Sequence, residues 1–237
     1  WALRAQDAGA SAFNTALGYY VGYNVTTGIK NTLIGSYAGN NITTGSYNVA
    51  LGHSALQTED THGYNTAIGF EALKVQNAGA NAYNTAVGYQ AGVAVSTGIN
   101  NTIIGGLAGD ALTTGNGNVA LGYRALTTED GHGANVAIGF QALYAQNAGA
   151  DAYNVAVGYN AGVAVSTGVE NTLIGGLAGD ALTTGEKNVA LGYSALGAED
   201  TGDRNVAVGY YALNSLNYDG NAYNVAIGYN TGGALST

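Results

Sequence analysis

The sequence of 237 residues contains no cysteine, no proline and no methionine, and only 9% of its residues are charged. The absence of cysteine excludes disulfide bonds and thiol chemistry. The absence of proline excludes a collagen-like triple helix and leaves every strand amide able to donate a hydrogen bond. Because the chain begins with Trp1 rather than methionine, we expect it to be a fragment or processed portion of a longer fibre.

Positive charge is scarce as well. Six Lys and Arg residues stand against fifteen Asp and Glu residues, which gives a formal net charge of −9. A nucleic-acid partner requires Lys and Arg on its phosphates, and an anionic membrane attracts the same residues. The chain also has no apolar run of about 18 residues, the length that a membrane span needs. The sequence therefore argues against nucleic-acid binding and against membrane insertion by this segment.

One short motif, Asn-(Thr/Val)-(Ala/Leu/Ile)-(Ile/Leu/Val)-Gly, dominates what the sequence does contain. Its thirteen copies begin at Asn14, Asn31, Asn48, Asn65, Asn84, Asn101, Asn118, Asn135, Asn154, Asn171, Asn188, Asn205 and Asn224. The spacings 17, 17, 17 and 19 occur three times in this order, which makes four coils one super-repeat. Short fixed periods are typical of solenoids. We predict a single repeat domain over 1–237, with super-repeats starting near residues 14, 84 and 154 and a partial copy from 224.

A coil as short as the motif spacing cannot hold two helices but accommodates two short strands and two turns. The small and β-branched motif centre predicts a strand, and the glycine that closes every motif predicts a positive φ or a close backbone approach. Stacked coils place the thirteen asparagines in one column, where their amides can bond to the coils above and below. The prediction is an all-β parallel β-solenoid, or β-roll, of thirteen coils whose motif spacing is 17 or 19.

The two faces of the motif strand predict an oligomer. Motif positions two and four share one face and position three lies on the other, and both faces are largely apolar. Such a strand is typically covered on both sides, whereas a coil of this size has an interior on one side only. We assign the face of position two to burial and expect further copies of the chain to cover the second face, most simply in a homotrimer.

The motif copies Asn-Thr-Ala-Leu-Gly, Asn-Val-Ala-Leu-Gly, Asn-Thr-Ala-Ile-Gly and Asn-Val-Ala-Ile-Gly resemble the head repeats of trimeric autotransporter adhesins of the YadA type. They are equally similar to repeats in bacteriophage tails and fibres. The resemblance extends from about Asn14 to the end of the chain, although the coil here is longer than is usual in that family. It implies a left-handed parallel β-roll, three chains around one axis, and an extracellular or virion-surface location.

Acidic loops recur once in each super-repeat. Residues 58–63 read TEDTHG, residues 128–133 read TEDGHG, and residues 198–203 read AEDTGD without a histidine. Paired carboxylates with histidine suit metal binding or acid–base chemistry, and carboxylates with loop carbonyls suit calcium. We expect solvated turns and no enzymatic activity, because a catalytic constellation does not usually recur in every super-repeat of a rod. Calcium is the alternative, and its candidate ligands are Glu59, Asp60, Glu129, Asp130, Glu199 and Asp200.

Aromatic rings follow the motif glycine in nine coils, at Tyr19, Phe70, Tyr89, Tyr123, Phe140, Tyr159, Tyr193, Tyr210 and Tyr229. We expect these rings to pack over the glycine turns at the edge of a thin core. Where position three is large, at Leu33, Ile103 and Leu173, the ring is replaced by Ser36, Gly106 and Gly176. We interpret this pattern as volume exchange in one packing layer. The alternative is a ligand-binding column for a glycan or protein, formed by Tyr89, Tyr123, Phe140, Tyr159, Tyr193 and Tyr210.

The longer coils, in which the motif spacing is 19, carry inserts at 76–83, 146–153 and 216–223, with a similar segment at 6–13. We expect them to project as loops, where binding residues often lie. Ice binding requires an exposed and regular threonine column. It is disfavoured because position two alternates between Thr and Val and lies on the face assigned to burial.

The sequence therefore predicts a structural and adhesive fibre segment of a virion tail fibre or a bacterial surface adhesin. A stiff homotrimeric rod of this kind would project from the surface or contribute to attachment, with a host-surface glycan or protein as partner. A carbohydrate-binding module that uses the aromatic column is the second hypothesis, and an ice- or mineral-surface-binding solenoid is the third. Apart from calcium, no cofactor is expected.

Overall fold

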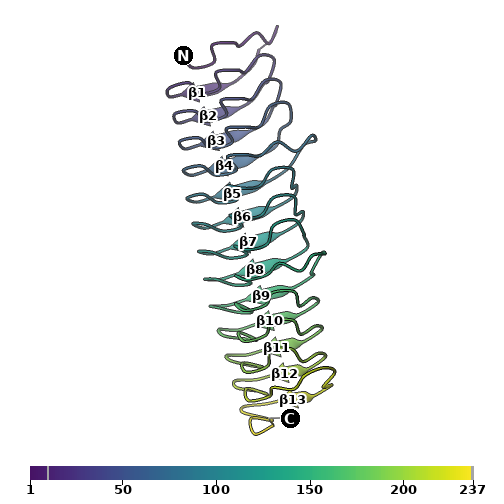
Figure 1. The fold of residues 1–237 in the computed structure, drawn as a ribbon. Helices are drawn as coiled ribbons and strands as arrows, with labels where there is room; N and C mark the ends of the chain where they lie inside the picture. Colours follow the sequence, from purple (N-terminus) through teal and green to yellow (C-terminus); the bar gives the residue numbers. More distant parts are fainter. Residues whose placement is uncertain (10, 236–237) are drawn as a thin grey trace. The chain divides into compact units, whose positions relative to one another are not determined.

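The computed structural model describes residues 1–9 and 11–235. Its chain forms thirteen β-strands of three residues each (Figure 1). The strands are β1 (Thr15–Leu17), β2 (Thr32–Ile34), β3 (Val49–Leu51), β4 (Thr66–Ile68), β5 (Thr85–Val87), β6 (Thr102–Ile104), β7 (Val119–Leu121), β8 (Val136–Ile138), β9 (Val155–Val157), β10 (Thr172–Ile174), β11 (Val189–Leu191), β12 (Val206–Val208) and β13 (Val225–Ile227). None of the described residues belongs to a helix long and apolar enough to cross a bilayer.

The chain divides into two compact units, with β1 to β6 in the first and β7 to β13 in the second. Within each unit every strand pairs in parallel with the strand one coil further along. The register matches equal motif positions, as Ala16 with Leu33 in the first unit and Ala156 with Leu173 in the second. The predicted all-β parallel β-solenoid, with thirteen turns that repeat at the motif spacing, is therefore confirmed.

The motif glycine meets both conditions that the sequence suggested. Gly158 has a φ of +146°, and a Cβ atom there would lie 2.3 Å from the backbone oxygen of Gly175 in the next coil. Gly88 has a φ of +144° and stands in the same relation to Gly105. A left-handed φ favours glycine, and the close approach of successive coils leaves no room for a side chain.

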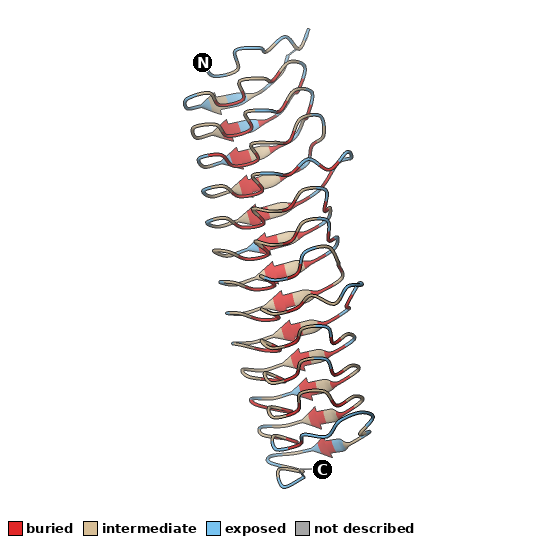
Figure 2. Ribbon diagram, viewed as in Figure 1, coloured by how far each residue is buried: buried red, intermediate tan, exposed pale blue. Residues whose placement is uncertain are grey.

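The solenoid interior lies on the side of motif position three. The prediction that the face of position two is buried is therefore wrong. Ala86, Ala156 and the other alanines at this position except Ala16 are buried, whereas positions two and four remain partly exposed in strand after strand. Figure 2 shows the buried centre of most strands between less buried ends. Position two therefore faces outward. The interior is thin, and a small alanine fits it better than a column of Val and Ile.

Large residues at position three are accommodated by glycines in the adjacent turn. Leu173 is fully buried. Its side chain lies 2.7 Å from where a Cβ of Gly162 would stand and 2.8 Å from that of Gly179. Both glycines occupy position nine of their coils, counting the motif Asn as one, and in other coils position nine is a buried leucine such as Leu143. A large side chain at position three is thus matched by a glycine at position nine. The predicted match with the residue after the motif glycine, such as Gly176, is wrong.

Candidate functional site

The motif asparagines form a ladder in each unit, and all of them except the half-buried Asn14 and Asn224 are buried. Within each unit the Asn Oδ1 accepts the backbone N–H of the Asn one coil further along, at 2.8–3.2 Å. In the same coil Nδ2 commonly donates to the carbonyl fourteen residues on, as from Asn154 to Gly168 at 2.7 Å. These bonds tie the strand to the far turn, so the asparagine column has a structural role.

The rings after the motif glycine stack on one another outside the core. His53, Phe70 and Tyr89 form one stack in the first unit, with centroids 5.4 Å apart. In the second unit the stacks are Tyr123–Phe140–Tyr159 and Tyr193–Tyr210–Tyr229, with centroids 5.3–5.6 Å apart. These rings are exposed, for example 55% for Tyr89 and 58% for Tyr159. They do not close the edge of the core as expected, and their faces are turned mainly toward each other.

A second aromatic column precedes the motif and was not singled out from the sequence. The residue before the motif Asn is aromatic in six copies, at Phe13, Tyr47, Tyr64, Tyr83, Tyr153 and Tyr223, and all six are exposed. Tyr47, Tyr64 and Tyr83 stack at 5.0 and 5.1 Å. The signal was visible as an aromatic residue one place before the Asn. Along the sequence the two columns stand one on each side of the strand residues.

Comparisons with known protein families, characterised proteins and solved structures find no match. The solenoid fold is established by the structure itself. The resemblance to adhesin and phage-fibre repeats, with the handedness and the trimer that it implies, stays a prediction.

A buried column at position twelve of the coil carries polar residues where aliphatic ones are the rule. Val25, Ile42, Val95 and Leu112 represent the aliphatic coils and are fully buried. In the same position stand the buried Glu59, Gln76, Glu129, Gln146 and Glu199. Burial raises the pKa of Glu59 to about 7 and also raises the pKa of Glu129 and Glu199. The acidic loops predicted to be solvated turns therefore place their glutamates inside the solenoid.

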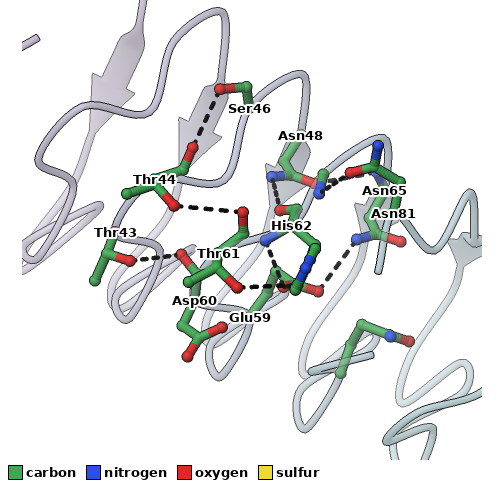
Figure 3. A network of polar contacts seen from close by, with 12 residues as sticks. Thr43, Thr44, Ser46, Asn48, Glu59, Asp60, Thr61, His62, Asn65 and Asn81 are labelled. Atoms are coloured by element: carbon green, nitrogen blue, oxygen red, sulfur yellow. Dashed lines mark hydrogen bonds and ion pairs between the residues drawn. The ribbon is translucent and has the colours of Figure 1, made fainter. Parts of the chain in front are cut away.

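Each buried glutamate turns back onto its own loop. Glu59 Oε1 accepts the backbone N–H of His62 at 3.2 Å (Figure 3), and Glu129 Oε1 accepts that of His132 at 3.1 Å. The histidine Nδ1 atoms lie 4.0 and 3.5 Å from the same carboxylate oxygens. The following aspartate, Asp60 or Asp130, places a carboxylate oxygen within 4.8 Å of the other two groups. The loops thus bring together the Glu, Asp and His that the sequence indicated.

The third loop differs as the sequence predicts. Glu199 is buried and accepts the backbone N–H of Gly202 at 2.7 Å and, at 3.4 Å, that of Tyr218. No histidine faces it, because Gly202 occupies the equivalent position. Asp200 contributes its backbone oxygen to Thr183 of the preceding coil at 2.7 Å. This loop shows that the turn forms without the histidine.

The inserts of the longer coils project as expected. Gly79, Ala80 and Asn81 are exposed, and Figure 1 shows a loop reaching beyond its neighbours beside β4. At 6–13, Ala10 lies outside the described residues.

Proposed function

We propose that the chain is a structural and adhesive fibre segment whose outward strand face is covered by further copies of itself in a homotrimer. Its setting is the surface of a virion, in a tail fibre, or of a bacterium, in an adhesin. The chain has no role as an enzyme in this proposal. A host-surface glycan or protein is the partner toward which such a segment projects or contributes attachment.

The outward face of the strands is the observation that carries the proposal. Position two is Thr or Val and position four is Ile, Leu or Val in every strand, and no charged side chain interrupts them within the strands. Leu51 and Leu191 remain 41% and 44% exposed. Contiguous apolar patches on a surface usually mark an interaction site, and tyrosine, which lines this face in two columns, is enriched at protein interfaces. The same face repeats from coil to coil within each unit, which offers a second copy of the chain an apolar surface to cover.

A lysine placed on this face tests the proposal. Ile138 is the outward position-four residue of β8. Because an unpaired charge is costly to bury, Ile138→Lys should convert the oligomer to monomer while the β-type circular dichroism is retained. Thr184→Lys, in an exposed turn outside the strands, is the matched control and should leave the mass unchanged. Equal masses for the two variants would contradict the proposal.

A glycan-binding module remains the second candidate, because the stacked rings are exposed. Sugars bind to ring faces, and here most faces are occupied by the neighbouring ring. Tyr159→Ala and Tyr89→Ala should therefore leave cell binding intact if the chain is a fibre segment, and abolish it if the rings bind a glycan.

An ice- or mineral-surface binder is the third candidate. The outward orientation of position two removes one argument against it, since Thr66, Thr85 and Thr102 face away from the core. In the second unit, however, position two is Val in every strand except β10. A threonine column therefore does not continue, and freezing-point hysteresis should be absent.

A further inference from the structure

We propose that the Glu129 loop, and more weakly the Glu59 loop, is a binding site for a divalent transition-metal cation with the preferences of Zn²⁺. The donors are the Glu129 and Asp130 carboxylates and the His132 imidazole, or Glu59, Asp60 and His62 in the first unit. Each set comes from four consecutive residues of one turn. The proposal is independent of the fibre function.

The unsatisfied atoms of the second loop point to a ligand. Glu129 is fully buried, and its Oε2 has no hydrogen-bond partner. His132 Nδ1 is also buried as an atom and has no hydrogen-bond partner, and its ion-pair contact is the other Glu129 oxygen at 3.5 Å. A buried polar atom without a hydrogen-bond partner destabilises the fold, because its contact with water is lost and not replaced. A cation between the carboxylate and the imidazole satisfies both groups at once.

The geometry of the loop is close to what a metal ion requires. The candidate donor atoms of Glu129, Asp130 and His132 all lie within 4.8 Å of one another. Zinc bonds of about 2.0–2.1 Å in a tetrahedron bring ligand atoms to roughly 3.4 Å apart. Side-chain rotations of Asp130 and His132, which lie at the surface end of the loop, can close this difference. Meanwhile Glu129 Oε1 is held by the backbone N–H of His132, and contacts of this kind orient metal-binding carboxylates.

The donor set selects the metal. Calcium takes six to eight oxygen ligands, whereas this site offers an imidazole nitrogen and two carboxylates. Imidazole with carboxylate is a common zinc donor set, and three protein ligands leave a fourth position for water. Calcium, the alternative that the acidic residues suggested, is therefore the less suitable ion for these two loops.

The two loops differ in one residue that predicts unequal affinities. In the first loop His62 Nδ1 lies 2.9 Å from the hydroxyl of Thr61, so a metal must compete with that hydrogen bond. In the second loop the equivalent residue is Gly131, which has no hydroxyl. Glu59 Oε2 also has a partner, the Nδ2 of Asn65 at 3.5 Å, whereas Glu129 Oε2 has none. The Glu129 loop should be the tighter site.

The test is equilibrium dialysis and calorimetric titration of the metal-stripped chain with ZnCl₂, followed by NMR of the histidine side chains. We expect two zinc ions per chain, one tight and one weaker, with the His132 resonances shifting first. His132→Ala should lower the tighter affinity by at least about 10-fold, since changes to outer-shell groups alone cost 10- to 100-fold. Thr61→Gly should strengthen the weaker site.

The chain supplies its own controls. His53 stacks on Phe70 and belongs to neither donor set, so His53→Ala should leave both affinities unchanged. Glu199→Gln, in the loop without histidine, should also have no effect. His132→Ala is expected to fold, because Gly202 stands at the same position in the third loop. Zinc binding of equal strength by His132→Ala and the unmodified chain would overturn the proposal, as would displacement of the zinc by an equal concentration of calcium.

Discussion

Replacement of one asparagine of the ladder should destabilise the neighbouring coils of the second unit. The fully buried Asn154 accepts the N–H of Asn171 at 2.8 Å. It also donates to the oxygen of Gly168 at 2.7 Å and to Oε1 of Gln146 at 2.6 Å. Asn154→Ala leaves three buried polar groups without these bonds. Each such loss costs about 1–3 kcal/mol, so the expected destabilisation is about 3–6 kcal/mol after partial relaxation.

The measurement combines urea unfolding, followed by circular dichroism, with amide hydrogen exchange. Exchange resolves the effect along the coils, because repeat proteins open locally, and the Asn171 amide should lose its protection most. Asn217→Ala is the matched control, since Asn217 is exposed and surface substitutions usually stay within about 0.5 kcal/mol. A loss below about 1 kcal/mol for Asn154→Ala would refute the reasoning, because buried unsatisfied groups cost more than that.

Three further predictions concern the same unit. Gly158→Ala places a Cβ 2.3 Å from the oxygen of Gly175 and should abolish stable folding of that coil by urea titration, whereas Gly149→Ala, which meets no atom within 4 Å, should cost only about 1–2 kcal/mol of left-handed strain. Leu173→Ala should cost about 2–5 kcal/mol in the same assay, the usual range for a buried leucine. Because burial raises the folded-state pKa of Glu199, its contribution is full below the unfolded pKa and is lost as the pH rises through the folded pKa. Glu199→Gln should therefore lessen the fall in melting temperature with rising pH, and an identical pH profile would contradict this.

The coil and its register could be predicted from the sequence because the spacing of the motif determines both. Within each unit, residues at equal motif positions pair with each other. The glycine that ends the motif indicated a close backbone approach, and Gly158 does lie close to Gly175 one coil on.

The side of the strand that faces the core was predicted wrongly. Alternation separates two faces but does not say which is inside, and the choice followed hydrophobicity rather than volume. Asn154 and Ala156, both smaller than Val or Ile, lie on the thin interior side, and their size was the usable signal.

The candidate sites were predicted less completely. The acidic loops were found from their composition. The burial of Glu129 was not predicted, because each loop was interpreted by itself as a solvated turn. Alignment of the coils would have shown Glu129 and Gln146 at the position of Val95 and Val165, which are buried. The outward stacking of rings such as Tyr159 depends on the direction of each side chain at a turn, and the motif does not specify that direction.

The outward apolar face is the centre of this account, and the solution mass of the unmodified chain tests it most directly. Light scattering on a folded sample at low micromolar concentration should give three times the chain mass of 23.7 kDa. A folded species of 23.7 kDa would contradict the account, because Leu51, Leu191 and their neighbours would then face water.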